Sequence, residues 1–145
     1  MNRPKIEPLD NGHYRLLKPY MYSTNAGSAI IVPKGYITNG ADIPRFFWRL
    51  YPPFSPEYMP AVIVHDYLCD EAEQKGNDKQ LYLLADEVFR EILLKLGVSR
   101  VRATIFYKAV RFYSHRLICR IHRFISFGIK VIFNRSRHCR AYWAR

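Results

Sequence analysis

The chain has 145 residues, enough for one domain with a buried core, and its 49% hydrophobic content excludes a globally disordered protein. Its three cysteines, Cys69, Cys119 and Cys139, are odd in number and form no C-x-x-C pair, so no disulfide framework is expected. The N-terminal segment lacks an apolar run, so no signal peptide is predicted.

The net charge of +11 is unevenly distributed along the chain. Residues 1–91 hold ten Lys and Arg against twelve Asp and Glu, whereas residues 92–145 hold thirteen Lys and Arg and no acid. Such a long stretch with one sign of charge indicates an anionic partner: nucleic acid, an acidic membrane surface or the acidic face of a protein. The alternative is a basic surface that is only solvated.

The N-terminal third is predicted to form short strands. H-Y-R-L-L-K-P-Y-M-Y (13–22) alternates loosely, and S-A-I-I-V (28–32) is a β-branched run after the turn signal S-T-N-A-G. G-Y-I-T (35–38) is a third, shorter candidate strand. N-G-A-D-I-P-R (39–45) then predicts a loop, because its residue types favour turns.

Helices are predicted for the rest of the chain. The first carries A-V-I-V-H-D-Y-L (61–68) and ends in the polar E-Q-K-G-N-D stretch. The second spans residues 79–96, with Gly97 at its C-terminal end. Ser99 is predicted to cap a third helix, which continues toward the basic tail.

These elements predict an α+β fold: a small N-terminal antiparallel sheet followed by three or four helices, of which the last is basic and amphipathic. We place the domain at residues 1–113 and a basic amphipathic extension at 114–145. At about 100° per residue, apolar and basic residues of the extension separate onto opposite sides of a helix. The apolar side holds Leu117, Ile118, Ile121, Phe124, Ile125, Ile129 and Ile132. The candidates for binding an anionic surface are Arg116, Arg120, Arg123 and Lys130.

The basic extension is open to several interpretations. Its Arg residues interrupt the apolar stretch, so a membrane-spanning helix is not expected. A cationic amphipathic helix binds a membrane interface or docks on a partner and leaves its Arg side chains for phosphates. A core helix with a solvated basic face is the alternative. The amino-acid sequence shows no motif for contacts to DNA bases, so sequence-specific DNA recognition is not expected.

A zinc site is a further interpretation of the extension. Its ligands would be His115, Cys119 and His122, with His138 or Cys139 as a fourth donor. The surrounding Arg residues disfavour a cation, so this interpretation is the weaker one.

Three stretches together resemble a known protein family. They are V-P-K-G-Y-I-T-N-G-A-D-I-P-R-F-F-W (32–48), V-H-D-Y-L (64–68) and A-D-E-V-F-R-E-I-L-L-K-L-G-V (85–98). In this order they resemble the small phage and prophage protein family catalogued as domain of unknown function 1353, over about residues 28–113. The resemblance implies a bacteriophage or prophage origin and brings no established activity.

Two positions depart from the pattern of that family. The family's loop resembles T-D-G-A-S-I-P, whereas this chain has T-N-G-A-D-I-P, so the acid stands at Asp42 and position 39 is Asn39. A loop acid that is a metal ligand would not tolerate this exchange. A loop whose side chains bond only to local backbone tolerates it better.

The polar residues of the three motifs define a candidate site. His65 and Asp66 are the candidate catalytic pair, and Asp86 follows twenty-one residues after His65, enough for one helix to end and the next to return antiparallel. Asp86 would then orient the His65 ring, as carboxylates do in general-base dyads. Asn39, Asp42 and Arg45 are the candidate binding residues of the loop.

The site has two interpretations. In the first, a small hydrolase acts on a lipid or phosphate ester with His65 as general base, and a divalent metal at His65, Asp66 and Asp86 is compatible with it. The pair resembles the active helix of calcium-dependent secreted phospholipases, but the chain lacks their glycine-rich calcium loop. It also resembles the pair of metal phosphohydrolases, whose further histidine has only His13 as a counterpart. In the second, the three residues form a buried hydrogen-bond network.

The preferred functional interpretation is a phage-encoded accessory or virion-associated protein. Its cationic tail would engage an anionic surface or phage structural proteins, and the hydrolase is the alternative. The expected location is the host cytoplasm or the virion, peripheral to the inner membrane if the tail binds lipid. Asp70 and Glu71 are expected at a solvated helix end.

Overall fold

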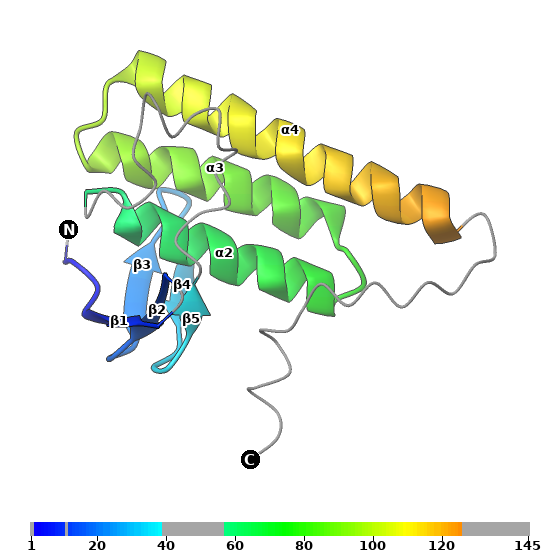
Figure 1. Cartoon of the computed structure of the whole chain (residues 1–145). Helices are drawn as coiled ribbons and strands as arrows, with labels where there is room; N and C mark the ends of the chain where they lie inside the picture. Colours follow the sequence, from blue (N-terminus) through cyan, green and yellow to red (C-terminus); the bar gives the residue numbers. More distant parts are fainter. Residues whose placement is uncertain (1, 11, 39–56, 126–145) are drawn as a thin grey trace.

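The computed structural model describes residues 2–10, 12–38 and 57–125, with side chains as far as residue 112. Five short strands come first, followed by three helices, so the predicted α+β fold is confirmed (Figure 1). The strands are β1 (Ile6–Leu9), β2 (His13–Leu16), β3 (Tyr20–Ser23), β4 (Ala29–Val32) and β5 (Ile37–Thr38). The helices are α2 (Met59–Gln74), α3 (Lys79–Lys95) and α4 (Arg100–Ile125).

The strands form two small antiparallel sheets rather than the single predicted one. One sheet has the order β1–β2–β5, and the other is the β3–β4 hairpin. The predicted strand at 13–22 is divided between them, because it contains Pro19, which has no N–H to donate to a strand ladder. Strand β1 was not predicted; its Pro8 is tolerated because β1 lies at the edge of its sheet.

The β3–β4 hairpin closes at the predicted turn. The Thr24 N–H donates to the Ser28 carbonyl at 2.9 Å, and Gly27 N–H donates to the Thr24 carbonyl at 3.0 Å. Gly27 has a φ of +83°, a conformation that side chains with a Cβ rarely adopt. The turn therefore fixes the register in which Met21 faces Ile31 across the hairpin.

Helices α2 and α3 form an antiparallel pair with well-defined ends. Asp78 caps α3, accepting hydrogen bonds from the N–H groups of Gln80 at 2.8 Å and Leu81 at 3.4 Å. At its other end, α3 stops at Lys95 with Leu96 as its C-cap, and the N–H of the following Gly97 donates to the Leu94 carbonyl at 3.1 Å. These ends set the helical register that brings residues 65 and 86 to the same level.

Helix α2 lies between the strands and α3 (Figure 1). It contacts β4 and β5 on one side and α3 on the other. This placement explains why the unbroken apolar run Ala61–Val64 is buried all round the helix, instead of showing the usual single apolar stripe. The core continues through α3 to α4, where the Phe89 and Phe106 rings lie 6.5 Å apart, edge to face.

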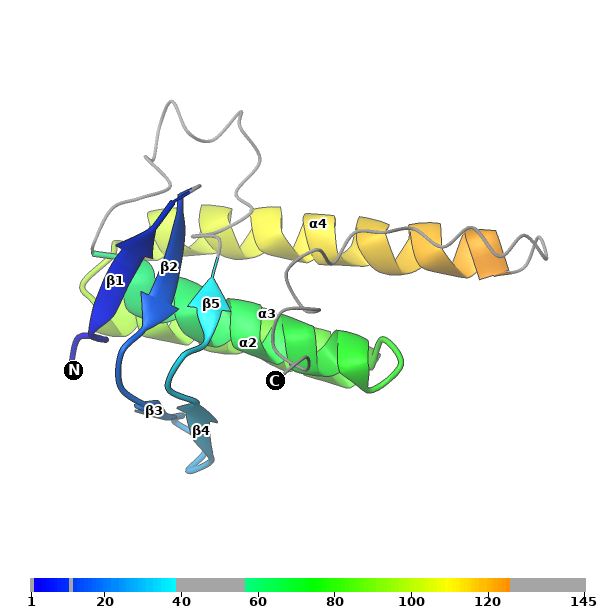
Figure 2. The same ribbon diagram turned by 60° about the horizontal axis from the view of Figure 1, so that its bottom comes forward.

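Helix α4 is longer than the helices it packs on. Its C-terminal end extends beyond the α2–α3 pair in both views (Figures 1 and 2). Ser99 caps its start, as predicted, with its Oγ 3.4 Å from the Arg102 N–H nitrogen. The helix runs without a break across position 113, where we had divided domain from extension. Positions 116, 120 and 123 are helical, and Lys130 lies outside the described residues.

Candidate functional site

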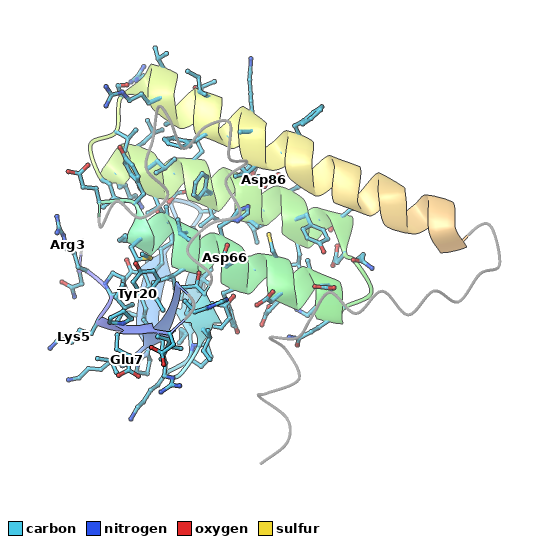
Figure 3. The ribbon with its side chains drawn as sticks, viewed as in Figure 1. Arg3, Lys5, Glu7, Tyr20, Asp66 and Asp86 are labelled. Atoms are coloured by element: carbon cyan, nitrogen blue, oxygen red, sulfur yellow. The ribbon has the colours of Figure 1, made fainter. Side chains whose placement is uncertain are left out.

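The centre of the candidate site is a contact between α2 and α3. His65 follows the buried run of α2, and its Nε2 lies 3.2 Å from Oδ1 of Asp86 on α3. The side chain of His65 is 14% exposed, whereas that of Asp86 is only 2% exposed. Figure 3 shows Asp86 projecting from α3 beside α2, which carries Asp66. A buried carboxylate therefore holds one edge of a largely buried imidazole.

Asp66 links the same histidine to the strands. Its Oδ1 lies 3.8 Å from Nδ1 of His65, and its Oδ2 accepts a hydrogen bond from the Thr38 hydroxyl at the end of β5. Thr38 is itself buried. The carboxylate of Asp66 is thus oriented by the sheet, and the two adjacent residues of the motif join α2 to different elements.

Electrostatics favour a charged His65. Burial lowers the pKa of the imidazole, but its interactions with the neighbouring Asp66, Asp86 and Cys69 side chains outweigh burial and hold the pKa well above the usual 6.5. The raised pKa favours the protonated ring, which lies between the Asp66 and Asp86 side chains. The neutral ring, which is the form that accepts a proton, becomes abundant only above this raised pKa.

Cys69 lies against the ring one helical turn after His65. Its Sγ is 3.7 Å from Nε2 and 3.9 Å from Nδ1, so the sulfur is aligned with neither nitrogen. This geometry does not form a Cys-His nucleophile pair, in which the thiol points at one nitrogen. This contact was not predicted from the sequence, although a spacing of four residues on a helix signals it.

A second polar contact extends the site toward β5. The Tyr36 hydroxyl donates to Oδ2 of Asp70 at 2.7 Å, and the Tyr36 ring meets the Tyr67 ring edge to face at 5.6 Å. The prediction of a solvated helix end is therefore wrong for Asp70, whereas the Glu71 side chain is 34% exposed near the end of α2. Burial raises the pKa of Asp70 to about 6, and Asp66 adds to this, although the Tyr36 hydrogen bond opposes it. Glu71 accepts from the Tyr67 hydroxyl at 2.9 Å.

A metal site at His65, Asp66 and Asp86 finds no support in the described part of the chain. No group of three or more His, Cys, Asp or Glu side chains among those residues is arranged to hold an ion. The loop candidates Asn39, Asp42 and Arg45 lie outside the described residues. So do the side chains named for the zinc interpretation and the anion-binding side chains of the extension.

The arrangement is suited to moving a proton at Nδ1. With Nε2–H donating to Asp86, the tautomer that leaves the Nδ1 lone pair available is favoured. Among the described residues, the nearest groups to Nδ1 are Asp66 at 3.8 Å and Cys69 at 3.9 Å, both beyond ordinary hydrogen-bond length. Neither contact is an ordinary hydrogen bond to Nδ1, so Nδ1 is the ring atom with the weaker polar contacts.

Comparison with known proteins places the chain in a family and gives no activity. The family model described as "Protein of unknown function (DUF1353)" matches residues 14–110. An uncharacterized protein of Sinorhizobium fredii (strain NBRC 101917 / NGR234), y4jT, is 30% identical over 66 residues. The match covers 45% of this chain and 20% of that protein, so the chain spans only a small part of this relative. No solved structure matches. Within the described residues, no helix has the length and apolar character needed to cross a membrane.

Proposed function

The chain belongs to the DUF1353 family, and we propose that it is a small ester hydrolase in which His65 takes the proton of an attacking water. One observation carries this proposal: Nε2 of His65 lies 3.2 Å from the buried carboxylate of Asp86, while Nδ1 lies 3.8 Å from Oδ1 of Asp66. Histidine held by a carboxylate at one nitrogen is the arrangement of general-base dyads, because the carboxylate fixes the tautomer and stabilises the imidazolium that forms.

The reaction uses two proton transfers at one atom. Neutral His65 accepts a proton from water at Nδ1, and the resulting hydroxide attacks the carbonyl carbon or phosphorus of the ester. The imidazolium, stabilised by Asp86, then returns the proton to the departing alkoxide. Asp66 sits beside Nδ1 and is held by Thr38, so its role is to position the water.

The charge of the chain supports an anionic substrate, a lipid or a phosphate ester. Residues 92–145 contain no Asp or Glu to balance their Lys and Arg. The resulting positive electrostatic potential raises the local concentration of anions. A substrate with a negatively charged headgroup or phosphate fits this field better than a neutral or cationic one.

The test compares His65→Gln with the parent protein and with His13→Gln, which changes a histidine of β2 outside the site. Turnover of p-nitrophenyl fatty-acid esters, p-nitrophenyl phosphate and phosphatidylglycerol vesicles is measured for each. We expect H65Q to lose about a hundredfold or more in rate, as removal of a general base does, and H13Q to keep the parent rate. Equal rates for H65Q and parent protein would refute the proposal.

A second candidate function rests on α4. We propose that the extension makes the chain an accessory or virion-associated protein that attaches to an anionic surface, the partner being membrane, nucleic acid or a phage structural protein. The observation that favours it is the continuation of α4 to Ile125, past the α2–α3 pair, with Arg at helical positions 116, 120 and 123. Changing these three residues to Gln should abolish salt-sensitive binding. Unchanged binding would exclude this function.

A further inference from the structure

Helix α4 is apolar on two opposite sides over its first half. Ala103 and Phe106 face α3 and are buried, as core residues must be. On the other side, Val101 is 71% exposed, Ile105 40% and Phe112 60%. At about 100° per residue these three positions fall within about 40° of one another, so they form one outward stripe.

The outward stripe is accompanied by basic residues and a hollow. The described residues that line this shallow, open hollow are Arg100, Val101, Thr104, Ile105 and Lys108, all on α4. Arg100 and Lys108 are exposed, and Lys108 falls on the same side of the helix as the apolar stripe. A contiguous patch of exposed apolar residues with a polar rim often marks a binding surface, whereas single exposed apolar residues are common on any protein.

We propose that this outward face of α4, residues 100–112, is a binding surface for an anionic phospholipid bilayer. Val101 and Ile105 enter the boundary between headgroups and acyl chains, and Arg100 and Lys108 reach the lipid phosphates with their aliphatic stems against the apolar surface. Anionic lipid supplies both features that the face requires, apolar depth and negative charge. By helical periodicity, positions 116 and 123 of α4 lie on the same side and continue the basic character.

The composition of the face favours lipid over other occupants. A nucleic acid would match the basic residues, but it offers nothing to exposed aliphatic side chains such as Val101 and Ile105, because stacking requires planar groups. A second copy packed symmetrically on this face would place Arg100 and Lys108 against the same basic residues of its partner, which is electrostatically unfavourable. Residues 92–145 contain no acid that would relieve this repulsion.

The chain supplies a matched control for the apolar stripe. Met21 and Ile31 are opposite each other on the β3–β4 hairpin and are 64% and 56% exposed. They are an apolar pair of similar exposure on a different element. Replacing them adds the same negative charge to the protein as replacing Val101 and Ile105, so the overall charge of the two variants is equal.

The experiment is co-sedimentation of the full chain with vesicles of phosphatidylcholine alone or mixed with phosphatidylglycerol. We expect the parent protein to bind the mixed vesicles, V101E/I105E to bind at least about tenfold more weakly, and M21E/I31E to bind like the parent. R100Q/K108Q should weaken binding to the mixed vesicles, and the salt dependence of its binding should be no steeper than that of the parent. Circular dichroism of each variant checks that helix content is retained.

Three results would overturn the inference. These are absence of binding by the parent protein to mixed vesicles, binding of V101E/I105E equal to that of the parent, and equal losses in V101E/I105E and M21E/I31E. A DNA duplex that binds the parent and loses the same factor in V101E/I105E would also count against a lipid surface. The inference is independent of the proposed hydrolase, because the readout is binding and H65Q should bind like the parent.

Discussion

Nε2 of His65 lies 3.2 Å from Oδ1 of Asp86, and this contact joins α2 to α3 across the middle of the helical pair. The next residue, Asp66, points to another element and accepts a hydrogen bond from Thr38 of β5. Two adjacent side chains of one helix therefore connect three elements. The same contacts that stabilise the fold also give His65 the geometry of a proton-transfer group, so stability and the proposed activity depend on the same atoms.

Asp86→Ala should destabilise the fold. It removes a buried carboxylate and leaves the His65 imidazolium without its closest partner. Loss of one member of a buried ion pair lowers the free energy of unfolding by about 3 kcal/mol or more. Urea unfolding at neutral pH measures this change, with the exposed Glu87→Gln on the same helix as control. A loss as small as that of the control would show that the pair contributes little.

The stability of the parent protein should fall as the pH rises above 6.5. The pKa of His65 is raised in the folded state, so the folded chain binds the His65 proton more tightly than the unfolded chain does. Its contribution is fully present below the unfolded pKa of 6.5 and is lost as pH rises through the folded pKa. The difference in urea midpoint between the parent and H65Q, measured at each pH, isolates the contribution of His65. A difference that does not change as the pH rises above 6.5 would contradict a raised pKa of His65.

Asp70 should produce a separate change in the stability of the protein at acidic pH. Its pKa is raised from 3.8 to about 6 in the folded state, because burial disfavours the carboxylate. The stabilisation by its protonated form is present below pH 3.8 and is lost as pH rises through about 6, so stability falls over this interval. Asp70→Asn should remove that fall. Equal pH dependence of D70N and parent protein would place the titration elsewhere.

Glu91→Gln should loosen the β3–β4 hairpin from α3. Oε1 of Glu91 accepts from the Tyr22 hydroxyl, the Asn25 N–H at 2.8 Å and Lys95 Nζ at 3.0 Å. Burial alone would raise the pKa of Glu91, but these donors lower it. We expect a loss of about 2 kcal/mol in the free energy of unfolding, because charge-assisted hydrogen bonds are weakened. Amide exchange in the hairpin should rise in E91Q and stay unchanged in E87Q.

The sequence was sufficient to predict the helices, because their signals are local. Asp78, Gly97 and Ser99 act at the helix ends through their own backbone geometry and side-chain oxygens. The proximity of His65 and Asp86 could be predicted because their two helices are joined by a short turn and run antiparallel. These are relations between residues that are close in sequence or related by one antiparallel return.

Contacts between the strands and α2 were beyond sequence reasoning. The hydrogen bonds from Tyr36 to Asp70 and from Thr38 to Asp66 depend on where β5 packs, and no periodicity encodes that position. The same holds for the division of the strands into two sheets. The raised pKa of Asp70 follows from such packing, and the sequence suggested a solvated residue instead.

The central claim, that His65 and Asp86 act as one proton-transfer dyad, is tested most directly by the pH dependence of ester hydrolysis. Rates are measured from about pH 6 to about pH 10 for the parent protein and Asp86→Asn. The parent rate should rise through a pKa well above 6.5, and in D86N this limb should move to lower pH with a reduced maximum. A limb at or below 6.5 in the parent, or an identical profile in D86N, would contradict the dyad.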